Sequence, residues 1–109
     1  MQIRDVPFAT TLWLTVPPTT HPGASGVAVW RTLEVGNLRV RVVEYSPGYA
    51  ADHWCERGHV LYVLEGELVT TLQDGRTFRL SAGMSYQVAD GAEPHRSQTD
   101  TGARLFIVD

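Results

Sequence analysis

The sequence predicts an all-β fold, a sandwich or barrel, built as a single domain. Val, Leu, Tyr, Phe and Thr gather in short runs, Gly, Pro, Asn or Asp separate these runs, and helical periodicity is almost absent. A chain of 109 residues is long enough to bury one sizeable core and too short for two. The runs predicted as strands cover residues 27–35, 38–46, 60–73, 76–81 and 103–109.

Residues 1–26 are predicted to form an N-terminal arm or an edge strand in front of a barrel over residues 27–109. Within this segment the stretch PPTTHPGASG is rich in proline, which lacks an amide donor, and in glycine, which leaves the backbone unrestrained. We therefore expect no regular structure there. His21 lies in this stretch and is expected to be solvated, because loops run over the surface of proteins.

The later runs carry more specific signals. In LRVRVVEY, Leu38, Val40 and Val42 alternate with Arg39, Arg41 and Val43, which is typical of a strand with one face toward a core. Further on, Asp74-Gly75 separates two runs and predicts a hairpin. Both residues tolerate the positive φ that the two central positions of a type I′ turn require.

The charge distribution argues against several classes of partner. The net charge is −3, and the nine basic residues are all arginines scattered without a cluster, so neither nucleic acid nor an anionic membrane surface is an expected partner. The N-terminus does not look like a signal peptide, and no segment approaches the roughly 20 apolar residues that span a bilayer. A soluble, cytoplasmic protein is the expectation. The single cysteine cannot form an internal disulfide.

The stretch DHWCERGH, residues 52–59, contains two of the four histidines and the only cysteine. On an extended chain His53 and Cys55 project from the same face, and His59 begins the next apolar run after a glycine. Together with His95, these side chains could face one cavity, and imidazole and thiolate are good ligands for metals such as zinc. The alternative is that Cys55 is a buried small hydrophobe and that the histidines are unconnected.

The residues around this stretch resemble the first motif of the cupins, small β-barrels of the double-stranded β-helix or jelly-roll type. In PGYAADHWCERGHVLYVLEG, His53 matches the first histidine of the motif and Gly66 matches its closing glycine. Cys55 then takes the place of the second histidine and His59 that of the glutamate. The chain looks most similar to small uncharacterised bacterial cupins that carry a motif of Asp, His, Cys and Trp.

A second stretch, DGRTFRLSAGMSYQVADGAEPHR, is similar to the second cupin motif and has His95 at the ligand position, so the resemblance covers residues 38–108. It implies a divalent transition metal, zinc or iron, with His53, Cys55, His59 and His95 as ligands. Because no carboxylate stands at the expected place, iron oxygenase chemistry is less favoured. The resemblance also implies a small-molecule pocket inside the barrel, with the lining residues Leu61, Val63, Met84 and Val88.

Two functions follow from this resemblance. The first is a metal-dependent enzyme acting on a small organic molecule, and the second is a non-catalytic binding module in which Cys55 senses metal or oxidant. The runs LYVLEG and ARLFIV are apolar on both faces. A chain with a single core covers only one face of each strand, so the other apolar face is expected to pack on a second copy. The two runs predict a symmetric homodimer, with the segment around Trp13 helping to cover the partner.

Overall fold

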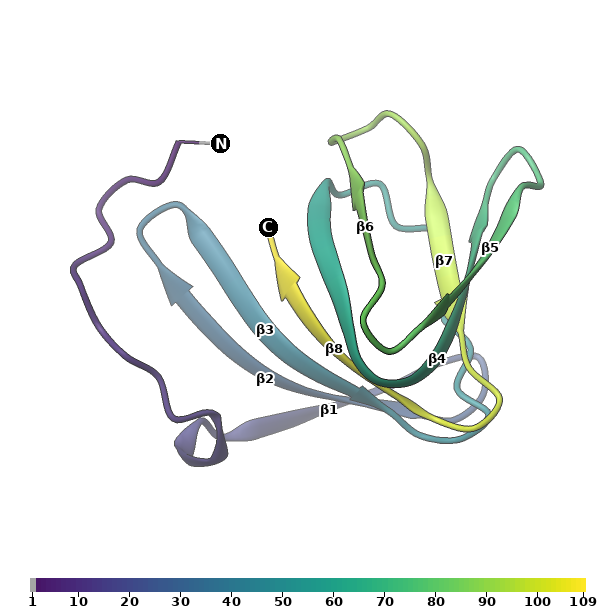
Figure 1. Cartoon of the computed structure of the whole chain (residues 1–109), viewed down its shortest axis with the longest axis horizontal. Coiled ribbons are helices and arrows are strands. Elements are labelled where there is room, and N and C mark those ends of the chain that lie inside the picture. The colour runs from purple at the N-terminus through teal and green to yellow at the C-terminus, as the bar shows by residue number, and fades with distance from the viewer. Residues whose placement is uncertain (1) are drawn as a thin grey trace.

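The computed structural model describes residues 2–109 and confirms an all-β jelly-roll architecture (Figure 1). Eight antiparallel strands follow the order β1-β2-β3-β8-β4-β5, and β6 and β7 also pair with β4. The strands are β1 (Pro18–Pro22), β2 (Val27–Val35), β3 (Leu38–Tyr45), β4 (His59–Leu72), β5 (Thr77–Ser81), β6 (Ser85–Val88), β7 (His95–Gln98) and β8 (Ala103–Val108). None of the helical segments within residues 2–109 is long and apolar enough to cross a membrane.

The core lies between the curved sheet of β2, β3 and β8 and the strands that face it. Leu105 of β8 pairs with Val43 of β3 on one side and with Val63 of β4 on the other, and all three side chains are fully buried. Burying an aliphatic side chain of this size contributes about 1.5–3 kcal/mol. This row therefore ties three neighbouring strands together.

Strand β4 belongs to both halves of the barrel. Its first part pairs with β6 and β8, and its second part pairs with β5 and β7. Between the two parts the register with β8 shifts, and Gly66 adopts a φ of +80°. A Cβ atom at Gly66 would lie 2.2 Å from the carbonyl oxygen of Gly102. Glycine thus allows β4 to bend from one half into the other.

The five strands predicted from the sequence are confirmed within two residues at each end, but the expectation for the Pro-rich stretch is wrong. Pro18–Pro22 forms the edge strand β1 against β2, and the two prolines stand at its ends, where a missing amide is tolerated. His21 is consequently not a solvated loop residue. Its ring stacks on Trp30 with the ring centroids 3.8 Å apart.

The predicted hairpin joins β4 and β5, but its turn is not a two-residue type I′ turn. The amide of Gly75 donates to the carbonyl of Leu72, and the amide of Leu72 donates to the carbonyl of Arg76. Gly75 has a φ of +99°, whereas Asp74 does not have a positive φ. The loop is therefore a three-residue connection that ends in a left-handed glycine.

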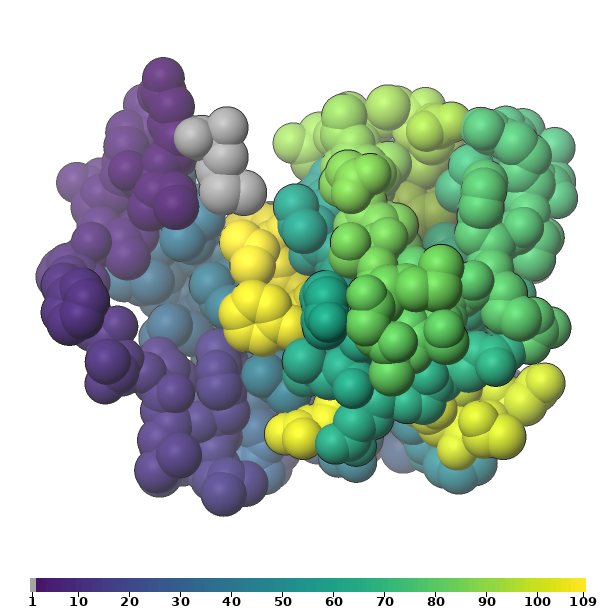
Figure 2. Space-filling view, viewed as in Figure 1, coloured from purple at the N-terminus to yellow at the C-terminus, as the bar shows by residue number. Residues whose placement is uncertain are grey.

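The chain before β1 runs along the outside of the molecule, where its purple atoms form a ridge in Figure 2. A short 3-10 turn, η1 (Trp13–Thr15), is held by the Arg31 guanidinium, which donates to the carbonyls of Trp13, Leu14 and Val16. The Trp13 ring packs edge-on against Phe106 of β8. Farther out, Phe8 is 97% exposed.

Candidate metal centre

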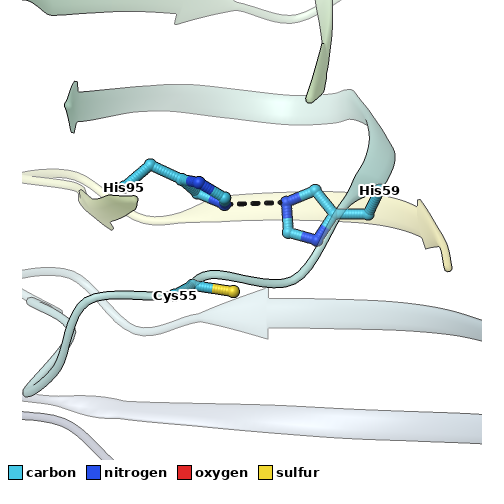
Figure 3. A group of neighbouring side chains, drawn as sticks. All are labelled: Cys55, His59 and His95. Atoms are coloured by element: carbon cyan, nitrogen blue, oxygen red, sulfur yellow. Dashed lines mark hydrogen bonds between the residues drawn. The ribbon is translucent and has the colours of Figure 1, made fainter. Parts of the chain in front are cut away.

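Three side chains bring metal-binding atoms together inside the barrel (Figure 3). One donor atom from each of Cys55, His59 and His95 lies within 4.8 Å of the other two. His59 begins β4 and His95 begins β7. Cys55 precedes β4 and forms a two-way backbone bridge with His95, with N···O distances of 2.7 and 3.0 Å. The backbone therefore fixes the thiol beside the second imidazole.

The imidazole rings of His59 and His95 face each other through their Nε2 atoms. The Nε2 atoms of His59 and His95 are 3.1 Å apart. His95 donates its Nδ1 proton to the carbonyl of Glu93 at 2.9 Å, so that its Nε2 atom carries the lone pair in the neutral ring. A second hydrogen bond that fixes the tautomer in this way is the usual arrangement of a histidine ligand.

The other nitrogen of His59 faces a carboxylate. Its Nδ1 atom is buried, finds no hydrogen-bond partner within residues 2–109, and lies 3.7 Å from Oδ2 of Asp109. Asp109 is held in turn by two hydrogen bonds from Arg39 and one from Arg41. In many metal sites of proteins, one nitrogen of an imidazole binds the ion and the other nitrogen faces a carboxylate. The environment of His59 thus fits a metal on its Nε2 side.

Burial and mutual contacts shift the pKa values of Cys55, His59 and His95. Burial, followed by the neighbouring His95, lowers the pKa of His59 to about 4, so this ring is neutral at physiological pH and free to act as a ligand. The interaction with His95 lowers the pKa of the Cys55 thiol, and the same interaction raises the pKa of His95. A cysteine with a lowered pKa is closer to the thiolate form, which is the form that binds metals.

Tyr86 of β6 completes the group, and the sequence did not single it out as a site residue. Its hydroxyl is 2.9 Å from Nε2 of His59. Burial raises the pKa of Tyr86 above its ordinary value, which keeps the hydroxyl protonated. A signal was present in the sequence, because Tyr86 shares the strand face of Met84 and Val88, the two residues predicted to line the pocket.

His53 lies outside the group that the other three residues form. Its ring nitrogen Nδ1 pairs with the carboxylate of the adjacent Asp52 at 2.7 Å, and its side chain is 76% exposed. The argument from strand alternation does not apply here, because Cys55 is an isolated bridge and residues 51–58 form no strand. Of the four predicted ligands, the structure brings three together.

A cavity of about 360 Å³ opens beside His95, the one donor residue of the three that lines it. His95 and Tyr86 line it, as do two of the predicted pocket residues, Met84 and Val88. The other two, Leu61 and Val63, are buried in the core instead. The volume is within the range of small-molecule sites.

A comparison with known protein families agrees with this architecture. A family model described as a cupin domain matches residues 41–109. A search of curated proteins found no match.

Solved structures with the same fold include several described as enzymes. The polyketide cyclase RemF from Streptomyces resistomycificus is 27% identical with a TM-score of 0.77, over 93% of this chain and 78% of that chain. Ectoine synthase from P. lautus is 17% identical with a TM-score of 0.77, over 93% and 76%. A predicted oxalate decarboxylase from Thermotoga maritima is 15% identical with a TM-score of 0.75, over 92% and 96%. The last two likenesses concern the fold alone.

Proposed function

Because the chain belongs to the cupin domain family, we propose that it is a metal-dependent enzyme that acts on a small organic molecule in its barrel pocket. The metal is a divalent transition ion, zinc or iron, held by His59, His95 and Cys55. Two imidazoles and a thiolate suit both metals, and three protein ligands are the number that catalytic zinc sites use while a further position stays open.

The observation that carries this proposal is the arrangement of the two imidazoles. Their Nε2 atoms face each other at 3.1 Å, while the Nδ1 atom of His95 donates to a carbonyl and that of His59 faces Asp109. His95 directs its Nε2 lone pair toward Nε2 of His59. A cation bound between the two Nε2 atoms, within reach of the Cys55 thiol, would accept an electron pair from each ring.

A metal held here would polarise a substrate oxygen or activate a water molecule. Two neighbouring residues, Asp109 and Tyr86, would assist the metal ligands and the substrate. Asp109, fixed by Arg39 and Arg41, orients the ring of His59. The protonated hydroxyl of Tyr86 lies at the junction of donors and cavity, where it can donate a hydrogen bond to a bound oxygen atom. The likeness to the polyketide cyclase supports an enzymatic role.

The test is the metal content of protein purified without a histidine tag. We expect close to one transition metal ion per chain by elemental analysis, and His59→Ala, His95→Ala and Cys55→Ser should each lower the affinity by about tenfold or more. His21→Ala and His53→Ala are the matched controls and should retain the metal. Unchanged metal content in a His59→Ala and His95→Ala double variant would contradict the proposal.

One observation favours a second function, a redox- or metal-sensing module. Cys55 is partly exposed and the pKa of its thiol is lowered by His95, which are the properties of reactive cysteines. If this function applies, the metal-free protein should react with iodoacetamide faster than a His95→Ala variant at pH 7. Equal rates would remove the support for a sensing thiol.

A further inference from the structure

Trp30 of β2 lies beside two arginines of the neighbouring strand β3. In the register of the two strands Trp30 pairs with Val43, which faces the core, and Arg41 is buried on that same side. The guanidinium carbon of Arg41 lies 4.4 Å from the centroid of the Trp30 ring, and that of Arg39 lies 5.7 Å from it. Both distances are within the range of cation–π contacts, so one indole contacts both arginines.

The two arginines share a single acidic partner. Asp109 accepts two hydrogen bonds from Arg39, at 2.8 and 2.9 Å, and one from Arg41, at 3.2 Å. The Nε atom of Arg41 is buried and has no hydrogen-bond partner within residues 2–109. Two neighbouring positive charges repel each other, and one carboxylate compensates only one of them. The negative face of the indole supplies further compensation and is the contact that both guanidiniums have in common.

The same carboxylate faces the proposed metal ligand His59. Oδ2 of Asp109, which accepts from Arg41, lies 3.7 Å from Nδ1 of His59. Partners of this kind fix the orientation of a histidine ligand, and their loss typically lowers metal affinity by about 10–100-fold. A row of contacts thus runs from Trp30 through the arginines and the carboxylate to the imidazole.

We propose that Trp30 is a positioning residue of the metal centre. Its indole holds the guanidiniums of Arg39 and Arg41, which in turn fix the carboxylate of Asp109. The carboxylate orients the ring of His59. Trp30 acts through these residues and is not itself a ligand. This inference rests on the proposed function, since it concerns the ligand set of the same site.

The affinity for Co²⁺ measures this role, because the visible absorption of Co²⁺ reports its binding to EDTA-treated protein. Trp30→Met removes the aromatic face and keeps an apolar side chain, and it should weaken Co²⁺ binding by about fivefold or more. Trp30→Phe restores an aromatic face and should stay within about twofold of the wild type. Trp13→Met is the matched control and should have no effect, because the indole of Trp13 packs on Phe106 and not on these arginines.

A second comparison separates positioning from a general loss of packing. If Trp30 acts through Asp109, Trp30→Met should weaken Co²⁺ binding little further in an Asp109→Asn background. An equal loss in both backgrounds would overturn the proposal, as would unchanged binding in Trp30→Met. If Trp30→Met does not fold, a fluorinated tryptophan at this position alone keeps the shape of the ring and weakens the cation–π contact. Unchanged Co²⁺ binding after that replacement would also overturn the proposal.

The Nε proton of Arg41 gives a readout that needs no metal. It is buried, so its exchange with solvent, followed by NMR in the metal-free protein, should be slow in the wild type and about tenfold or more faster in Trp30→Met. If the wild type binds no Co²⁺ but the exchange still responds, the metal-dependent function fails and Trp30 stands as the residue that fixes the arginines. If the wild type binds Co²⁺ and Trp30→Met changes neither affinity nor exchange, the metal site stands and the positioning role is wrong.

Discussion

His59 is a side chain whose protonation depends strongly on the fold. It is buried beside His95 and Tyr86, with Arg41 and Asp109 on its other side. Burial and the nearby His95 disfavour the charged ring more strongly than Asp109 favours it, and its pKa falls to about 4.

This shift predicts how the stability of the metal-free protein changes with pH. Between the unfolded pKa of about 6.5 and the folded value of about 4, the unfolded chain binds the His59 proton more readily, so acidification favours unfolding. From pH 7 to pH 4 the contribution of His59 should lower the free energy of unfolding by about 2–3 kcal/mol. Urea titrations of EDTA-treated protein would measure this fall.

Variants separate this contribution from the others. His59→Gln should flatten the pH dependence, whereas His21→Ala should leave it unchanged. The raised pKa of His95 acts in the opposite direction, because it adds stability at low pH that is lost as pH rises. An equal pH dependence in the wild type and His59→Gln would show that His59 does not contribute to acid destabilisation.

The sequence could predict the donor types at this site but not all of their positions. Cys55, His59 and His95 were found because the motif resemblance aligns whole stretches of chain. His53 was placed at the site by the same motif and by strand alternation with Cys55, which fails where residues 51–58 leave the sheet. Asp109 carried no local signal, because its contact with His59 depends on β8 lying beside β4.

The hairpin between β4 and β5 can be tested at the scale of one element. Gly75 has a φ of +99°, a conformation that β-branched residues resist, and the space around its Cβ position is open. Gly75→Val should therefore lower the stability by about 1 kcal/mol or more through backbone strain alone. Gly75→Asn should cost less, since asparagine tolerates this conformation.

Thermal melts of both variants would measure the difference. Gln73→Val is the matched control, because it adds the same side chain to an exposed loop position that does not have a positive φ. Equal melting temperatures for Gly75→Val and the wild type would mean that the loop relaxes to another turn.

The sequence predicted the strands that contain long apolar runs. It did not predict the strands whose formation depends on pairing with a neighbouring strand. β6 and β7 are four residues each and mostly polar, and they form because β4 offers an edge to each of them. In β3 the alternation was recognised, and the structure shows that the side of the strand that carries Val43 faces the core. Arg41 lies on the same side, where its guanidinium lies over the ring of Trp30. Burial of an arginine depends on its partner Asp109, distant in sequence.

At the scale of the whole molecule, the outer face of β4 predicts self-association. Val60, Tyr62 and Leu64 alternate along the strand and remain exposed, and Leu12 and Leu14 are exposed on the neighbouring N-terminal segment. Apolar side chains gathered in this way favour a partner surface, and a symmetric dimer would cover them with a second copy.

Light scattering at micromolar concentration should give the mass of a dimer. Tyr62→Glu should shift the protein toward the monomer, because it buries a charge at the interface, whereas Gln73→Glu adds the same charge on an exposed loop and should not. A monomeric wild type would contradict the assembly predicted from the apolar faces.

The position of β8 has a consequence for synthesis on the ribosome. β8 pairs with both β3 and β4, although it follows the other seven strands along the chain. While the nascent chain lengthens, β1 to β3 and β4 to β7 can each form local hairpins, but each group presents an open edge until Ala103–Val108 emerges and joins them. Folding is therefore completed only after Ala103–Val108 has been translated, and until then the edges of β3 and β4 that β8 covers stay unpaired and open to non-native pairing.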